Sequence, residues 1–77
     1  MSLAPKYTKA AAVTKSDSTV LKCKAFYVGG AGNVAIKTDA NATAVTFTAV
    51  LVGHVYEVEC YHIMDANTTA TAIVALW

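Results

Sequence analysis

The strongest constraint on the fold is a series of short runs in which apolar and polar residues alternate with a period of two. This alternation is typical of β-strands that bury one face. Turn-forming clusters separate the runs at residues 16–18, 38–42 and 65–68, and Gly53 indicates another reversal. No segment long enough for a stable helix shows an apolar stripe at the helical period. The pattern predicts an all-β fold, a small antiparallel β-sandwich or barrel of about five to six strands.

The 77-residue chain divides into two parts of different composition. Residues 1–15 contain Pro5 and scattered lysines among Ala and Thr, and they are predicted to form an extended N-terminal arm. Residues 16–77 are predicted to form the β-domain. A domain this small gains little stability from its own core. Because the chain is nevertheless 56% hydrophobic and only 14% charged, we expect it to bury apolar surface against other copies of itself.

A glycine-rich segment joins two of the alternating runs. Its glycines are Gly29, Gly30 and Gly32. A phosphate-binding loop needs a helix after the glycines or a Gly-Lys-Ser/Thr ending, whereas residues 33–38 alternate, with Val34 and Ile36 on one face. The segment is therefore predicted to be the tight turn of a β-hairpin, in which the glycines supply positive φ angles.

Two further runs have well-defined faces. Residues 19–28 are predicted to form one strand, with a bend or bulge near Lys24, where the solvated face becomes apolar. Residues 44–48 are predicted to form a strand that points Val45 and Phe47 toward the core.

The longest strand signal covers residues 54–64. One face is mostly apolar and is predicted to point toward the core: His54, Tyr56, Val58, Cys60, His62 and Met64. The opposite face carries Glu57 and Glu59, which indicate solvent or a polar contact with another subunit. Tyr61 and Ile63 share this second face and are predicted to contact a neighbouring subunit.

The closing run, residues 69–77, becomes apolar on both faces toward its end. Such a strand is either central in its sheet or packs its outer face on a neighbouring subunit. Trp77 is the residue predicted to make that contact, because large aromatic side chains are enriched in protein interfaces.

Few residues have the pattern of a metal or catalytic site. His54, Cys60 and His62 share a predicted strand face, but a zinc site needs three or four ligands, usually with some from across the fold. Glu57 and Glu59 are predicted to lie about 6–7 Å apart on an exposed strand, a spacing found in glycosidases, yet the domain has no room for a cleft. We therefore predict no catalytic, cofactor-binding or metal-binding residues, and no enzyme.

Charge and hydropathy argue against two classes of partner. The chain has no arginine and a net charge of only +1, which argues against nucleic-acid binding. No run approaches the roughly 20 apolar residues of a membrane span, and the N-terminus lacks a secretory pattern. We therefore expect synthesis in the cytoplasm and no association with a membrane. In that compartment Cys23 and Cys60 are expected to be buried thiols, although they can pair in an oxidising setting.

Aromatic residues offer a second functional class. Side chains of this kind stack on sugars or bases, and the chain has Tyr7, Tyr27, Tyr56, Tyr61 and Trp77. Their predicted positions are scattered over different faces, which favours packing in the core and at interfaces. A carbohydrate-binding module is therefore the alternative function.

Three segments together resemble a known family. They are the Tyr-Val-Gly-Gly-Ala-Gly strand and turn at residues 27–32, the Val-Thr-Phe strand at 45–47, and the Thr-Thr-Ala-Thr to Ile-Val-Ala-Leu ending at 68–76. Over residues 23–77 the chain is similar to the short spike-base proteins of tailed bacteriophages and gene transfer agents. The resemblance implies a small β-domain on the capsid surface that assembles as a ring or cluster and supports a head fibre or spike. It implies no enzyme.

From this resemblance we expect a bacteriophage virion structural protein, either a capsid decoration or cement protein or a head-spike base. It is expected on the capsid surface after synthesis in the host cytoplasm, with a carbohydrate-binding host-attachment module as the alternative. Its expected partners are itself, as a trimer or pentamer, the major capsid protein, and a head fibre or spike protein.

The turn at Val52-Gly53-His54 departs from the family's Pro-Ala-Gly turn, which leaves open whether the protein carries a spike or only cements the capsid. The predicted subunit or capsid contacts are Pro5, Tyr7, Tyr61, Ile63 and Trp77.

Overall fold

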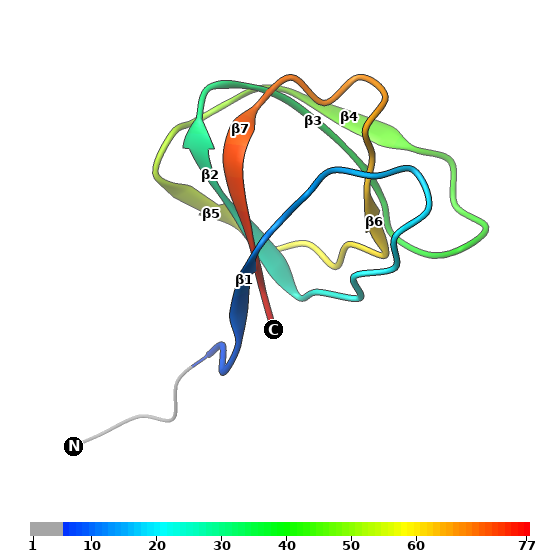
Figure 1. The fold of residues 1–77 in the computed structure, drawn as a ribbon, viewed down its shortest axis with the longest axis horizontal. Coiled ribbons are helices and arrows are strands. Elements are labelled where there is room, and N and C mark those ends of the chain that lie inside the picture. The colour runs from blue at the N-terminus through cyan, green and yellow to red at the C-terminus, as the bar shows by residue number, and fades with distance from the viewer. Residues whose placement is uncertain (1–5) are drawn as a thin grey trace.

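The structure is a computed structural model that describes residues 6–77. It contains seven β-strands (Figure 1): β1 Ala10–Ala12, β2 Ala25–Gly30, β3 Gly32–Lys37, β4 Val45–Val50, β5 His54–Tyr56, β6 His62–Ile63 and β7 Thr71–Leu76. No helix in this part of the chain is long and apolar enough to cross a membrane.

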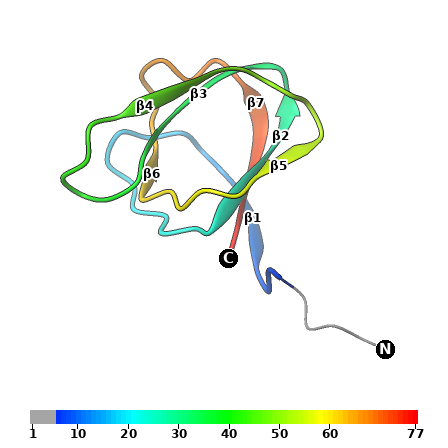
Figure 2. The ribbon, with the colours of Figure 1, turned by 180° about the vertical axis from the view of Figure 1, so that it is seen from behind.

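The strands form two antiparallel sheets. One sheet has the order β1-β7-β2-β5, and the other has the order β4-β3-β6. Figures 1 and 2 show the two sheets curving around a shared interior, with the β4–β5 connection joining them at one side. The prediction of a small all-β sandwich or barrel is confirmed. The strands number seven rather than five to six, because one predicted strand is divided in two and the predicted arm contributes another.

The core lies between the two sheets. Its largest fully buried side chains are Phe26, Ile36, Ile63, Val28, Val34, Cys23 and Cys60. The ring of Phe26 stacks on Tyr56 at 5.3 Å between ring centroids and meets the edge of Phe47 at 6.0 Å. Burial of each large apolar side chain stabilises the fold by about 1.5–3 kcal/mol. This cluster therefore holds together residues from both sheets.

Phe47 packs against the core as predicted, but the same prediction is wrong for Val45. Val45 is 55% exposed, although it lies opposite the buried Ile36. It is the first residue of β4, and β4 is an edge strand. No further strand covers it, so the alternating pattern identified its side of the sheet but not its exposure.

The hairpin prediction for the glycine segment is wrong. Gly29 and Gly30 lie inside β2, and β2 and β3 belong to different sheets, so these two strands do not pair. The glycines instead permit close approach of β7, because a Cβ on Gly29 would lie 2.9 Å from the Cβ of Ala72, and one on Gly30 would overlap the hydroxyl of Thr71. Gly32, at φ +153°, begins the strand that carries the chain into the second sheet.

The predicted strand at residues 54–64 is interrupted. Its first part, β5, pairs with β2, and its second part, β6, pairs with β3. Residues 57–61 between them cross from one sheet to the other. Ile63 consequently lies in the core at 1% exposure, so its predicted contact with another subunit is wrong. His54, predicted to face the core, is exposed at the edge of its sheet.

The N-terminal segment contributes a strand to the β-domain. β1 lies within the predicted arm and pairs with β7, and the N–H of Val13 donates to the carbonyl of Ile73 at 2.9 Å. Residues 10–13 therefore belong to the sheet rather than to a separate arm. β7 lies between β1 and β2, so of the two alternatives predicted for the closing strand the structure shows the central position. Pro5 lies outside the described residues.

The predicted break near Lys24 is also present. Lys22 adopts a left-handed conformation at φ +52°, Cys23 forms an isolated bridge with Cys60, and β2 begins only at Ala25. The alternation within residues 19–28 thus continues through a bend rather than along one straight strand.

Candidate assembly surface

The outer face of the four-stranded sheet is apolar. Tyr27 lies opposite both Val55 and Val74, and Val74 lies opposite Ala12, so these side chains share one side of the sheet. The neighbours of Tyr27 along β2 point into the core, so this side is the outer one. We call the outward positions the apolar sheet face: Ala10, Ala12, Ala25, Tyr27, Gly29, Val55, Ala72, Val74 and Leu76. Ala25, which lies opposite Leu76, is already buried within the subunit.

The apolar sheet face is partly exposed and closely packed. Val55 is 36% exposed, Ala12 and Ala72 are exposed, and Tyr27 is half-buried. A Cβ on Gly29 would lie 3.7 Å from the ring of Tyr27, so this ring lies close to the bare backbone of its own strand. A contiguous face without charge is typical of a surface that packs against another protein.

The outer face of the three-stranded sheet is polar by contrast. Thr46 and Thr48 alternate with the inward-pointing Phe47 on β4 and are exposed. Asn33 and Lys37 lie on the same side of β3, whereas Ala35, which lies opposite Thr46, is buried. Asn33 Oδ1 accepts a hydrogen bond from the N–H of Ala49 at 2.9 Å. This sheet has one buried and one solvated face, as antiparallel sheets commonly do.

The turn between β4 and β5 extends the apolar surface. Leu51 and Val52 are 65% and 56% exposed, and Gly53 reverses the chain at φ +76°. The turn is held in place because the N–H of Leu51 donates to the hydroxyl of Tyr56 at 2.7 Å and that of Gly53 donates to the carbonyl of Val28 at 2.7 Å. The sequence analysis missed these two residues, although an apolar pair directly before a reversal glycine is an available signal.

Tyr7 and Trp77, two of the predicted contact residues, are engaged within the subunit. The hydroxyl of Tyr7 donates to Glu57 at 2.8 Å, and Lys6 forms an ion pair with the same carboxylate. These hydrogen bonds, first from Lys6 and then from Tyr7, hold the pKa of Glu57 below its usual value. The indole N–H of Trp77 donates to the carbonyl of Leu21 at 2.9 Å, and the ring packs against the core.

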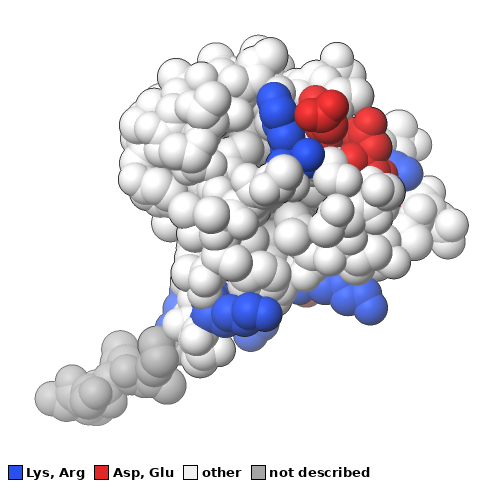
Figure 3. Space-filling view, in the orientation of Figure 1, with Lys and Arg blue, Asp and Glu red and all other residues white. Residues whose placement is uncertain are grey.

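Lysine side chains surround the aromatic residues at one end of the molecule. The Lys9 ammonium lies 4.6 Å from the Trp77 ring, and that of Lys22 lies 5.9 Å from the Tyr61 ring. Figure 3 shows several lysines along the lower end, and acidic side chains beside a further lysine near the top. We call the lower group the basic end: Tyr7, Lys9, Lys22, Lys24, Tyr61 and Trp77. It also contains two carboxylates, because Glu57 contacts Tyr7 and Glu59 lines a pocket with Lys22 and Lys24.

The structure does not assemble the other candidate sites. His54 and His62 belong to different sheets, and no three acidic, His or Cys side chains of residues 6–77 gather to hold a metal ion. Glu57 and Glu59 lie in the crossing between β5 and β6, outside any strand. The tyrosines form no shared platform, because Tyr27 lies on the apolar sheet face while Tyr56 stacks in the core.

Comparison with known proteins gives one informative match. No protein-family model and no curated protein sequence matches the chain. Among solved structures, it is similar to a chain in the capsid of a native gene-transfer-agent particle, computed with C5 symmetry. The TM-score is 0.80 and the identity 27%, and the match covers 92% of this chain and 83% of that chain. The match supports a capsid-related protein, in agreement with the broader expectation from the sequence.

Proposed function

We propose that this protein is a virion structural protein on the capsid surface, acting as a decoration protein or head-spike base and forming a ring of identical copies. The observation that carries the proposal is the similarity, over nearly the whole chain, to a component of a gene-transfer-agent capsid. The role requires no catalytic residues, since binding and assembly alone perform it.

The apolar sheet face is proposed as one side of the contact between neighbouring copies, because in a ring each contact joins two different surfaces. A stable protein contact buries about 800 Å² on each partner, which is roughly a sixth of the 4679 Å² surface of this chain. A four-stranded face of this length covers only about 300 Å² at ordinary strand spacings, so we propose that the exposed turn at Leu51 and Val52 adds to the contact surface. No charge on the face has to be desolvated. The capsid that contains the similar chain was computed with C5 symmetry, and a pentamer fits that symmetry, while the trimer remains the other proposed ring.

The basic end is the proposed contact with the major capsid protein. Tyr7, Tyr61 and Trp77 lie there among lysines, and this combination fits a capsid surface that is acidic and partly apolar. The opposite end, where Asp17 accepts hydrogen bonds from the N–H groups of Asp65 and Ala66, is then left for a head fibre or spike protein.

Capsid binding is the direct test. Purified protein is mixed with capsids that lack it, and co-sedimentation is measured over a range of protein concentrations. We expect saturable binding that weakens with salt and with Lys22→Glu plus Lys24→Glu, because both charges lie at the basic end. Thr46→Glu plus Thr48→Glu is the matched control on the polar sheet face and should leave binding unchanged. Absence of saturable binding by the wild-type protein would contradict the proposal.

A glycan array distinguishes the proposed structural role from the alternative, a carbohydrate-binding host-attachment module. A capsid-surface structural protein should bind no glycan, whereas a host-attachment module should show saturable binding that Tyr61→Ala removes. Such binding would favour the carbohydrate-binding alternative.

A further inference from the structure

Cys23 and Cys60 face each other across the base of the sandwich. Each main-chain N–H donates to the carbonyl of the other residue, at 3.1 and 3.0 Å. In an antiparallel pair of this kind the Cα atoms lie about 5.5 Å apart, which is within the range of about 4.4–6.8 Å that a disulfide spans. Both cysteines are free and almost fully buried. The backbone therefore already holds the two thiols at a distance from which they can be joined.

The two thiols have different chemical character. The Cys23 thiol hydrogen-bonds to the Cys60 carbonyl at 3.8 Å, and the Cys60 thiol to the Val58 carbonyl at 3.4 Å. Hydrogen bonding from Cys60 lowers the pKa of Cys23 to about 7, whereas its interaction with Cys23 and its burial raise the pKa of Cys60. We take Cys23, which has the lower pKa and lines the adjoining pocket, as the attacking thiol of the pair.

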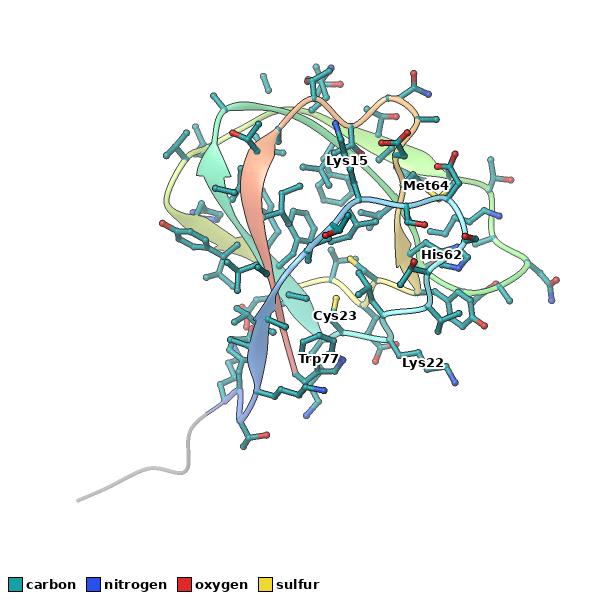
Figure 4. The ribbon with its side chains drawn as sticks, viewed as in Figure 1. Lys15, Lys22, Cys23, His62, Met64 and Trp77 are labelled. Carbon is teal, nitrogen blue, oxygen red and sulfur yellow. The ribbon has the colours of Figure 1, made fainter. Side chains whose placement is uncertain are left out.

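A pocket of about 330 Å³ adjoins the pair, and Lys22, Lys24 and Glu59 line it together with both cysteines. Figure 4 shows Cys23 and Lys22 at the same end of the molecule. The pocket gives a small neutral molecule a path to the pair. Because the cysteines are 1% and 0% exposed, small reagents are expected to reach them faster than large ones.

We propose that Cys23 and Cys60 are a site of reversible oxidation that hydrogen peroxide closes into an intramolecular disulfide. The Cys23 thiolate attacks one peroxide oxygen, the O–O bond breaks, and the leaving hydroxide takes up the proton that Cys23 had lost, forming water. Cys23 is then a sulfenic acid. The Cys60 sulfur attacks the Cys23 sulfur, the S–O bond breaks, and the hydroxide leaves with the Cys60 proton as a second water. The two thiols thereby supply the two electrons that reduce one peroxide.

The position of the pair allows the disulfide to close and to open again. The expected Cα separation is an ordinary one for a disulfide, so the bond can form with little movement of the backbone, and a small thiol reductant that enters the pocket can break it. The bridge is isolated between irregular segments, including the left-handed Lys22, and these segments can adjust. Once formed, the bond fixes the segment before β2 to the crossing between β5 and β6.

Peroxide treatment of the reduced full-length protein tests the proposal. We expect the intact mass to fall by two hydrogen atoms, and a non-reducing digest to join the peptides of Cys23 and Cys60. The melting temperature should rise by about 10 °C or more, since the bond closes a long loop, and dithiothreitol should reverse the shift.

Cys60→Ala and Cys23→Ala are the matched controls. In Cys60→Ala, peroxide should add oxygen to Cys23 without raising the melting temperature, and in Cys23→Ala it should leave the mass unchanged. If either variant fails to fold, the wild-type digest decides alone. Two thiols that remain open to alkylation after unfolding, or a cross-link between two chains, would overturn the proposal.

Discussion

The two sheets present opposite outer faces to their surroundings. On the four-stranded sheet, Tyr27, Val55 and Val74 form an apolar row across three strands. On the three-stranded sheet, Thr46 and Thr48 lie at the corresponding outward positions. Both sheets use the same alternation to build the shared core, so the core does not explain the difference. An apolar outer face indicates a surface that a further protein covers, whereas a polar one indicates solvent.

The largest expected effect is loss of assembly when charges are placed on the apolar sheet face. Tyr27→Lys combined with Val74→Lys should raise the dissociation constant between copies by at least about 100-fold, because two unpaired charges would be buried in the contact. Native mass spectrometry over a dilution series measures this constant.

The matched control places the same charges on the polar face. Thr46→Lys combined with Thr48→Lys should leave the oligomer unchanged, since both positions are solvated already. Equal dissociation constants for the two double variants would contradict the proposed difference between the two sheets.

The next effect concerns how closely β2 and β7 approach beneath the apolar sheet face. Gly29→Ala should lower the free energy of unfolding by about 1–3 kcal/mol, because its Cβ would lie 2.9 Å from that of Ala72. Gly53→Ala meets no atom within 4 Å, so it should cost only the left-handed strain of about 1–2 kcal/mol. Urea denaturation compares them, and only Gly29→Ala should also weaken assembly. Equal assembly of both variants would show that the close approach of β2 and β7 does not affect the contact between copies.

A smaller effect is expected from the polar face. Asn33→Ala removes the hydrogen bond that Asn33 Oδ1 accepts from the N–H of Ala49, and should cost about 0.5–1.5 kcal/mol of unfolding free energy. The oligomer should persist, because the residue stabilises β4 rather than a subunit contact. Dissociation of this variant at unchanged stability would mean that the polar face also takes part in assembly.

The smallest effect is expected at Glu57, which lies on neither face. Its pKa is lowered in the folded state by Lys6 and Tyr7, so its contribution is present above the usual glutamate pKa and is lost as the pH falls through the lowered value. All three groups are exposed to solvent, which keeps the contribution small. Glu57→Gln should lower the melting temperature slightly at neutral pH and not at all in acid. A large shift at neutral pH would show that this cluster holds the N-terminal segment in place.

The sequence was sufficient to predict the strands but not the pairs they form. The alternation correctly indicated the all-β class, the reversal at Gly53, the break near Lys24 and the inward side of Phe47. It did not indicate that β2 and β3 belong to different sheets. Main-chain N–H and C=O groups can pair any two strands, whatever their side chains, so alternation does not identify a strand's partner. Continuous alternation in residues 54–64 also concealed the crossing that places Ile63 in the core.

The candidate site was predicted only in part. The sequence indicated excess apolar surface and a closing strand that is apolar on both sides, and the structure locates that surface on the sheet in which β7 is central. The exposed pair Leu51 and Val52 was missed, since a run of apolar residues looks the same in a core strand and in a turn.

The sequence by itself therefore determined the all-β class and most of the extended runs, because side-chain alternation is a local property of the chain. Only the tertiary structure decided which strands are neighbours and which apolar side remains uncovered. Both depend on how all seven strands pack around one core, and no single segment contains that information.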